Sequence, residues 1–287
     1  MIISEENYKI EMEKLAQFIL IGSQKSGTTS LSHQLSQHAE IDFCKHKEPD
    51  FFSKNDNWKD QIADYHSLYQ PAPGKICGEG STTYTWLLEY PDTALRIFEY
   101  NPEMKLIYIM RHPVERIVSH YTHHLLKART KFSMEQEIFE VPTYIDHSRY
   151  AIQLRPYLEL FPTKNILLLL FEDYTRDPLQ TLYTIAKFLE IDPGGFDNID
   201  LKPQYQSIDR TGDTKLKKML TPLAQLLFPV KLRNSLRKPF VYQLDKKVEI
   251  SDDLKKRLWR YVEDDVTALE TIMGQSLDTW RKPPYTR

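Results

Sequence analysis

The sequence has few cysteines and no long hydrophobic run, and each shortage excludes a class of protein. Its 287 residues include only two cysteines, Cys44 and Cys77, which are too few for a disulfide framework. We expect both to be reduced thiols, as is typical of a cytoplasmic protein. The longest apolar runs, at Phe18–Ile21 and Ile166–Phe171, are far too short to span a bilayer, so no integral membrane segment is expected. Residues 1–15 are acidic and do not have the pattern of a signal peptide.

An excess of charge of one sign is also lacking. The chain has 38 Lys and Arg against 40 Asp and Glu, which gives a formal net charge of −2. Nucleic acid is therefore not an expected partner, and any anion must be bound by a local arrangement of residues. No linker-like segment divides the chain. We expect one domain over residues 1–287, with its core motifs in residues 18–192 and a helical C-terminal part over 205–287.

Short apolar runs alternate with amphipathic segments along most of the chain. Strands are predicted at Phe18–Ile21, Lys75–Gly80, Lys105–Met110 and Ile166–Phe171, and helices at residues 30–37, 91–100, from Pro113 onward, 150–160, 179–189 and 252–273, the last with Ser251 as N-cap. Strands that alternate with helices predict an α/β fold, with a central parallel sheet flanked by helices.

A loop with two glycines follows the first predicted strand and precedes a helix. It runs from Gly22 to Thr29 and reads GSQKSGTT. Glycines allow the backbone to turn tightly around an anion, and the amides at the following helix N-terminus point at a phosphate. An ATP-binding P-loop has a lysine directly after its second glycine, but here that position is Thr28 and the lysine is Lys25. The loop therefore predicts phosphate binding and disfavours magnesium-triphosphate chemistry.

A second polar pair follows the strand predicted at residues 105–110. Arg111 comes directly after that strand, where P-loop ATPases carry an aspartate for magnesium, and Ser119 lies two turns into the next helix. Open α/β sheets bind ligands at this edge, and an arginine with a hydroxyl suits a phosphate monoester. Arg116 in the same helix is expected to be a solvated side chain.

These segments resemble one known family. Residues 18–31, FILIGSQKSGTTSL, are similar to the 5′-phosphosulfate loop of sulfotransferases that use PAPS (3′-phosphoadenosine 5′-phosphosulfate), and the segment from Arg111 is similar to their 3′-phosphate motif. The likeness is closest to the branch with heparan-sulfate sulfotransferases and many bacterial sulfotransferases. It implies a P-loop-kinase-like sulfotransferase fold, PAPS as co-substrate, 3′,5′-ADP as product and no metal. The nucleotide contacts that it implies are Gln24, Lys25, Ser26, Gly27, Thr28, Thr29, Arg111 and Ser119.

The segment Lys47–Phe52, KEPDFF, resembles the K-E-x-x-F-F segment of the heparan-sulfate branch, whose glutamate is the proposed catalytic base. Sulfuryl transfer requires the acceptor oxygen or nitrogen to lose a proton, which a positioned carboxylate can accept. We therefore expect Glu48 to be the base and Lys25 to be a second catalytic residue. The alternatives are a surface glutamate paired with a neighbouring lysine, and His46 as the base, because the small-molecule branch uses a histidine.

Other features have weaker support. The segment Gly78–Tyr84 looks like the family's G-E-x-[ST]-x-x-Y, with Gly80 at the position where part of the branch has a lysine that reaches the sulfate. Tyr150 is either a nucleotide contact or a core tyrosine. The basic segment 215–238 is either a lid over the nucleotide, an acceptor surface or a solvated helix face, and Arg210 and Lys215 are the candidate lid residues.

Three histidines in one predicted helix, His120, His123 and His124, are expected to form a partly exposed polar face. An i, i+4 histidine pair can bind zinc, but no further ligand is evident in the sequence. The expectation for the whole chain is thus a cytoplasmic sulfotransferase that moves the sulfuryl group of PAPS to a hydroxyl or amine of a small metabolite or glycan. A P-loop nucleotide kinase and a non-catalytic nucleotide-binding protein are the alternatives.

Overall fold

The computed structural model describes residues 15–204, 211–213, 241–243, 248–282 and 284–285. The chain divides into two compact units. The first unit contains residues 15–112, Arg149–Lys202 and Glu263–Leu277, and the second contains Pro113–Ser148 and the described parts of 203–262 and 278–287. That residues 1–287 act as one domain stays a prediction.

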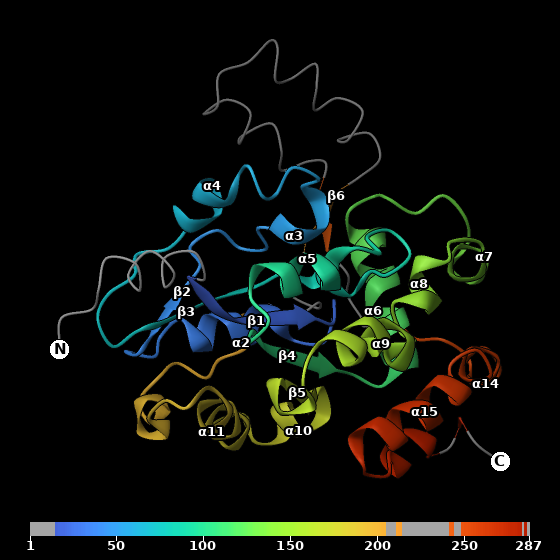
Figure 1. The fold of residues 1–287 in the computed structure, drawn as a ribbon. Helices are drawn as coiled ribbons and strands as arrows, with labels where there is room; N and C mark the ends of the chain where they lie inside the picture. The colour runs from blue at the N-terminus through green and yellow to red at the C-terminus, as the bar shows by residue number, and fades with distance from the viewer. Residues whose placement is uncertain (1–14, 205–210, 214–240, 244–247, 283, 286–287) are drawn as a thin grey trace. The chain divides into compact units, whose positions relative to one another are not determined.

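The first unit is built on a five-stranded parallel sheet (Figure 1). Its strands are β1 (Ala16–Gly22), β2 (Ile41–Phe43), β3 (Ile76–Gly80), β4 (Lys105–Met110) and β5 (Ile166–Leu170), in the spatial order β2-β3-β1-β4-β5. The predicted α/β class with a central parallel sheet is confirmed. Because β1 is the middle strand, the loop after it lies between the carboxyl ends of β3 and β4, at the edge where parallel sheets bind ligands.

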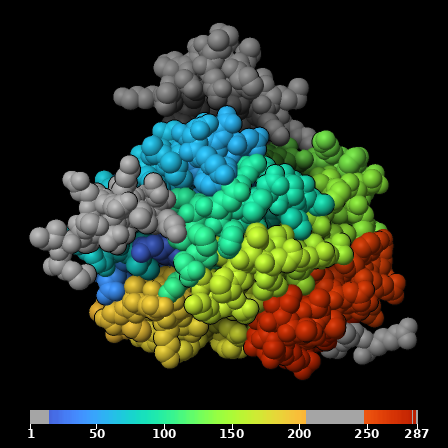
Figure 2. All heavy atoms as spheres, in the orientation of Figure 1, coloured from blue at the N-terminus to red at the C-terminus, as the bar shows by residue number. Residues whose placement is uncertain are grey.

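Helices flank the sheet on both sides. In the first unit they are α2 (Thr28–Leu35), α3 (Phe51–Lys54), α4 (Ile62–His66), α5 (Thr93–Tyr100), α9 (Tyr150–Leu160), α10 (Phe171–Arg176), α11 (Pro178–Leu189) and α15 (Glu263–Met273), with 3₁₀ turns η1 (Thr82–Thr85), η2 (Thr163–Asn165) and η3 (Pro193–Phe196). Figure 1 shows α10 and α11 on one side of the sheet and α3, α4 and α5 on the other. On the surface, the segments of α3, α5 and α9 lie as adjoining bands (Figure 2).

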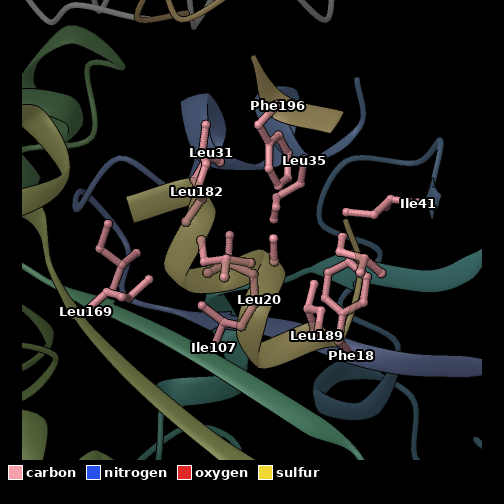
Figure 3. Close-up of a cluster of buried hydrophobic side chains, with 14 of the residues drawn as sticks. Phe18, Leu20, Leu31, Leu35, Ile41, Ile107, Leu169, Leu182, Leu189 and Phe196 are labelled. Carbon is pink, nitrogen blue, oxygen red and sulfur yellow. The ribbon is translucent and has the colours of Figure 1, made fainter. Parts of the chain in front are cut away.

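A hydrophobic core joins one face of the sheet to α2 and α11 (Figure 3). Leu31 and Leu35 of α2 and Leu182 of α11 pack over Phe18 and Ile107 of the central strands, and all five side chains are inaccessible to solvent. Fully burying one such side chain contributes roughly 1.5–3 kcal/mol. The helix that begins directly after the glycine loop is therefore fixed firmly to the sheet.

The second unit contains α6 (Pro113–Leu126), α7 (Met134–Glu140), α8 (Thr143–Asp146), α14 (Asp252–Trp259), the 3₁₀ turn η6 (Asp278–Arg281), and β6 (Thr211–Asp213) paired antiparallel with β7 (Val241–Gln243). Arg116 of α6 is wholly buried, so the expectation of a solvated side chain is wrong. Its guanidinium donates to Ser148 Oγ and to the Tyr144 carbonyl, each at 2.5 Å. A buried arginine needs such partners, and these hydrogen bonds connect α6 to α8 and the residues that follow it.

Of the three histidines of α6, His123 and His124 are partly exposed as predicted, and only His120 departs from the predicted polar face. His120 is buried, its Nε2 lies 3.2 Å from Nε2 of His124, and Nδ1 of His124 lies 2.7 Å from the Tyr144 hydroxyl. Burial lowers the pKa of His120 far below its ordinary value, and the Arg116 charge adds to this effect. Among the described residues, no group of three or more His, Cys, Asp or Glu side chains is arranged to hold a metal ion.

The helix predicted over residues 252–273 is interrupted. The chain forms α14 and α15, which are separated by residues 260–262. The amides of Tyr261 and Val262 in this interruption make i→i−3 hydrogen bonds. The acidic run Glu263–Asp265 opens α15, a position where the helix dipole favours negative charge. Ser251 caps α14 as expected, with Oγ accepting the Leu254 amide at 3.2 Å. None of the helices in the described part of the chain combines the length and the apolar character that a membrane crossing requires.

Candidate active site

The glycine loop connects the end of β1 to the start of α2. Ser23 ties it to the neighbouring strand β4, because its amide and its hydroxyl both donate to the Ile109 carbonyl, at 2.8 and 3.1 Å. The hydroxyl oxygens of Ser23 and Ser26 lie 2.6 Å apart, and both side chains are buried. The loop is therefore held in one conformation beside the carboxyl end of β4.

Three residues of this loop have positive φ values, Gly22 (151°), Lys25 (75°) and Gly27 (85°), and the last two lie in the left-handed helical region. A Cβ at Gly27 would lie 2.8 Å from the Phe171 ring, so only glycine fits there. A non-glycine residue in this region costs of order 1–3 kcal/mol, and such strain is concentrated at functional sites. The amides of Thr28 and Thr29 open α2, where the first N–H groups of a helix have no partner within it and attract anions.

The predicted phosphate contacts Gln24, Lys25, Ser26, Gly27, Thr28 and Thr29 all lie in this one turn of chain. Oε1 of Gln24 is buried and has no hydrogen-bond partner among the described residues. An orphaned buried polar group of this kind marks a place where a ligand or water completes the hydrogen bonding. The donor set, a half-buried lysine with helix-start amides and hydroxyls, suits a phosphate or sulfate group.

Glu48 lies in the turn that follows β2, at the same edge of the sheet. The turn is strained, since Glu48 and Asp50 have φ values of 52° and 54°. Burial raises the pKa of the half-buried Glu48 carboxyl above its ordinary value, and the Asp50 charge raises it further, while nearby cations oppose this shift. The loop lysine Lys25 is one of those cations, with a smaller effect than Lys47 and Lys54. A carboxylate with a raised pKa is the kind that acts as a general base near neutral pH.

Two phenylalanines anchor this turn in the interior. The Phe51 ring stacks on Tyr65 with centroids 4.5 Å apart, and the Phe52 ring meets Tyr65 and Trp58 edge-on at 5.2 and 5.6 Å. Phe52 is completely buried. Aromatic pairs of this geometry add about 0.5–1.5 kcal/mol beyond area burial. Phe51 and Phe52 therefore fix the position of the turn that carries the candidate base.

Hydrogen bonds from the chain after β3 hold the same turn. The Asp50 amide donates to Ser81 Oγ at 3.0 Å, and the Thr83 hydroxyl donates to Asp50 Oδ1 at 2.7 Å. Lys54 pairs with Oδ2 of the same aspartate at 2.5 Å. His46, the alternative base, is exposed, and its ring makes no hydrogen bond within the described part of the chain.

Arg111 lies at the end of β4, where its backbone is held by Tyr150. The Tyr150 hydroxyl donates to the Arg111 carbonyl at 2.7 Å and accepts the Arg111 amide at 3.4 Å. The guanidinium lies over the Phe171 ring, 5.1 Å from its centroid. Tyr150 is completely buried and thus positions Arg111 through its backbone; its own contact with a nucleotide stays a prediction.

The remaining predicted contacts lie outside the first unit. Ser119 is a half-buried residue of α6 in the second unit, so its pairing with Arg111 on one phosphate stays a prediction. Arg210, Lys215 and the basic segment 215–238 lie outside the described residues. In the first unit, a Cβ at Gly80 would lie 3.0 Å from Ser32 Oγ of α2, so any side chain at this position would be in close contact with that helix.

The segment Gly78–Tyr84 contributes one further group at this edge, for which the sequence predicted no role. Glu79 of β3 is a completely buried carboxylate that accepts hydrogen bonds from Tyr65, Tyr84 and Ser81. The signal in the sequence was the segment Gly78–Tyr84 itself, which has Glu79, Ser81 and Tyr84 at the fixed positions of G-E-x-[ST]-x-x-Y.

Comparisons with known proteins agree with these features. Residues 15–221 match the family model described as Sulfotransferase domain. Heparan sulfate glucosamine 3-O-sulfotransferase 5 of Mus musculus is 28% identical over 195 residues, which cover 63% of this chain and 55% of that protein. Heparan sulfate glucosamine 3-O-sulfotransferase 3B1 of Mus musculus is 32% identical over 187 residues, covering 62% of this chain and 46% of that protein. The chain thus spans about half the length of these relatives.

Among solved structures, a sulfotransferase from Alicyclobacillus acidocaldarius superimposes with a TM-score of 0.66 at 25% sequence identity. The match covers 93% of this chain and 99% of that chain.

Proposed function

Because this chain belongs to the sulfotransferase family, we propose that it transfers the sulfuryl group of PAPS to an acceptor hydroxyl or amine. The observation that carries the proposal is the placement of the phosphate-binding loop after β1 and of the half-buried Glu48 after β2 at the same edge of the parallel sheet. A phosphate loop alone also suits a kinase. A carboxylate with a raised pKa at the same edge of the sheet supplies what sulfuryl transfer additionally needs, a base for the acceptor proton.

The proposed reaction is an in-line displacement at sulfur. The acceptor oxygen or nitrogen forms a bond to sulfur, the bond from sulfur to the bridging oxygen breaks, and that oxygen keeps the electron pair as 3′,5′-ADP leaves. Glu48 accepts the acceptor proton. Lys25 and the amides of Thr28 and Thr29 stabilise the negative charge that grows on the bridging oxygen. Fixed donors aimed at developing charge usually make the largest single contribution to catalysis.

For the acceptor we propose a hydroxyl or amine of a small metabolite or glycan. Relatives named for 3-O-sulfation of heparan sulfate glucosamine favour a sugar hydroxyl. Gly80 offers no cation for a highly sulfated polymer, which favours a smaller acceptor. We also propose a cytoplasmic location, supported by the two buried free thiols Cys44 and Cys77.

Calorimetric titration with 3′,5′-ADP, PAPS and MgATP tests the nucleotide assignment. We expect 3′,5′-ADP and PAPS to bind and MgATP to bind much more weakly, because the loop has Thr28 where a P-loop ATPase has lysine. A protein that binds MgATP tightly and not 3′,5′-ADP is a kinase-type nucleotide binder, and the proposal is then wrong. A protein that binds PAPS but transfers no labelled sulfate to any component of a metabolite and glycan extract is a non-catalytic binder.

Replacing Glu48 by glutamine tests the base. Loss of general base catalysis lowers kcat by about 10²–10⁴-fold, while 3′,5′-ADP affinity stays within about threefold. The matched control is Glu103→Gln, which makes the same change at an exposed site before β4. Near-normal turnover by Glu48→Gln with intact 3′,5′-ADP binding contradicts the assignment, and His46→Gln is then the variant to compare.

A further inference from the structure

The buried carboxylate of Glu79 lies one strand away from the turn that carries Glu48. Its side chain is completely buried, and three hydroxyl groups donate to it. Tyr65 and Tyr84 donate to Oε1 at 3.0 and 2.7 Å, and Ser81 donates to Oε2 at 2.7 Å. The proposed reaction makes no use of this group. Burying a carboxyl group costs free energy of folding even where three neutral hydroxyls donate to it, so its presence at this position needs an explanation.

Two of the three hydroxyls also contact the Glu48 turn. Ser81 Oγ accepts the amide of Asp50 at 3.0 Å, and the Tyr84 hydroxyl accepts the amide of Phe52 at 3.3 Å. A hydroxyl has one proton to donate and two lone pairs to accept with. Because each proton is directed at Glu79, the lone pairs are left for the two backbone amides. The carboxylate therefore fixes the direction of two hydrogen-bond chains, which we call relays: from the Asp50 amide through Ser81 to Glu79, and from the Phe52 amide through Tyr84 to Glu79.

We propose that Glu79 is a positioning residue for the catalytic base. Through Ser81 and Tyr84 it holds the backbone from Glu48 to Phe52 in the conformation that presents the Glu48 carboxyl. The proposal rests on the proposed function of Glu48. The turn needs such support, since two of its residues have left-handed backbones, which persist only where surrounding contacts hold them.

A carboxylate performs this task and an amide of the same shape does not. Glutamine at position 79 would place an N–H₂ group where one oxygen now accepts. The hydroxyl facing that group would have to accept from it and could no longer donate to residue 79, so the direction of its proton would no longer be fixed. Glu79→Gln therefore loosens at least one relay while it conserves volume and burial.

Hydrogen exchange of backbone amides tests the positioning without any assay of turnover. In Glu79→Gln we expect the amides of Asp50 and Phe52 to exchange about tenfold faster or more, with no change at the Leu31 amide, which donates to the Gly27 carbonyl at 3.1 Å. The matched control is Tyr69→Phe. Its buried hydroxyl donates to Tyr65 and lies one step away from the carboxylate, and its removal leaves these amides protected.

Two further variants keep the test decisive if Glu79→Gln does not fold. Ser81→Ala is expected to speed exchange at Asp50 alone, and Tyr84→Phe at Phe52 alone, because each removes one relay. Unchanged protection of these amides in the folded variants overturns the proposal.

A double-mutant cycle then tests the connection to catalysis. Glu79→Gln is expected to lower kcat about 10–100-fold, the effect of a base displaced by a fraction of an ångström to one ångström, with 3′,5′-ADP affinity within about threefold. In the Glu48→Gln background the same change has no further effect on kcat, because Glu79 acts only through Glu48. Multiplicative losses overturn the proposal. If the unmodified protein transfers no sulfate, the proposed function fails, while the exchange measurement still decides whether Glu79 fixes the turn.

Discussion

Replacing Tyr150 by phenylalanine removes one hydroxyl from the end of β4 and tests whether Arg111 binds the 3′-phosphate. The ring keeps its place, packed edge-on to Tyr108 with centroids 5.9 Å apart. What is lost is the 2.7 Å bond to the Arg111 carbonyl and the longer 3.4 Å contact from its amide. The shorter bond is worth about 1 kcal/mol net and the longer one less. If that free energy orders Arg111 for binding, its loss weakens 3′,5′-ADP about fivefold.

The assay compares two ligands that differ only in the 3′-phosphate. Calorimetry with 3′,5′-ADP and 5′-AMP gives the affinity ratio that the 3′-phosphate contributes, and Tyr150→Phe should lower this ratio about fivefold. The control is Tyr157→Phe on the same helix α9, whose hydroxyl donates to the Tyr84 carbonyl and not to Arg111. An unchanged ratio in Tyr150→Phe, or an equal loss for both ligands, refutes the reasoning.

Three further predictions concern charge and backbone strain. Lys47→Gln removes a cation that lowers the pKa of Glu48, so the acid limb of the pH profile of kcat/KM should move to higher pH. A shift to lower pH contradicts the assignment of Glu48 as the base. Burial raises the pKa of Glu79 from 4.5 to about 7, so the folded state binds this proton more tightly than the unfolded state. The free energy of unfolding should therefore fall by up to about 3 kcal/mol between pH 4.5 and 7, at about 1.4 kcal/mol for each pH unit. Urea titrations of Glu79→Gln should lack this dependence on pH. Gly27→Ala forces a side chain into a left-handed backbone and against Phe171, which should cost about 2–5 kcal/mol in a denaturant titration, and an unchanged midpoint is the contrary result.

The strands of the central sheet were predictable because parallel strands are buried on both faces and read as unbroken apolar runs. β4 has the predicted bounds, and β1 and β5 lie within two residues of them. The edge strand β2 was not found, because its three residues include Asp42 and make no apolar run. Propensity alone does not detect a strand this short, which is fixed by its pairing with β3.

Contacts between residues far apart in the chain could not be predicted from the sequence. Arg116 looked like a surface residue because nothing near it in sequence revealed the Ser148 hydroxyl and Tyr144 carbonyl that satisfy its guanidinium. Glu79 belongs to the motif in Gly78–Tyr84, but its contacts were not predictable for the same reason, since Tyr65 and the Asp50 turn come from other segments. Motif spacing could identify residue types suited to a phosphate and a base, but not the contacts that hold them.

The loop and the candidate base are coupled through Lys25. Burial raises the pKa of Glu48, and the Lys25 charge is one of the cations that hold it down. Under the proposed function, the phosphosulfate of the donor binds beside Lys25 and offsets its charge. The cation then lowers the pKa of Glu48 less, and the negative charge of the donor raises it further. Glu48 thus becomes a stronger base when the sulfuryl donor is in place, so proton removal from the acceptor is favoured at the stage where sulfur is available to receive its electron pair.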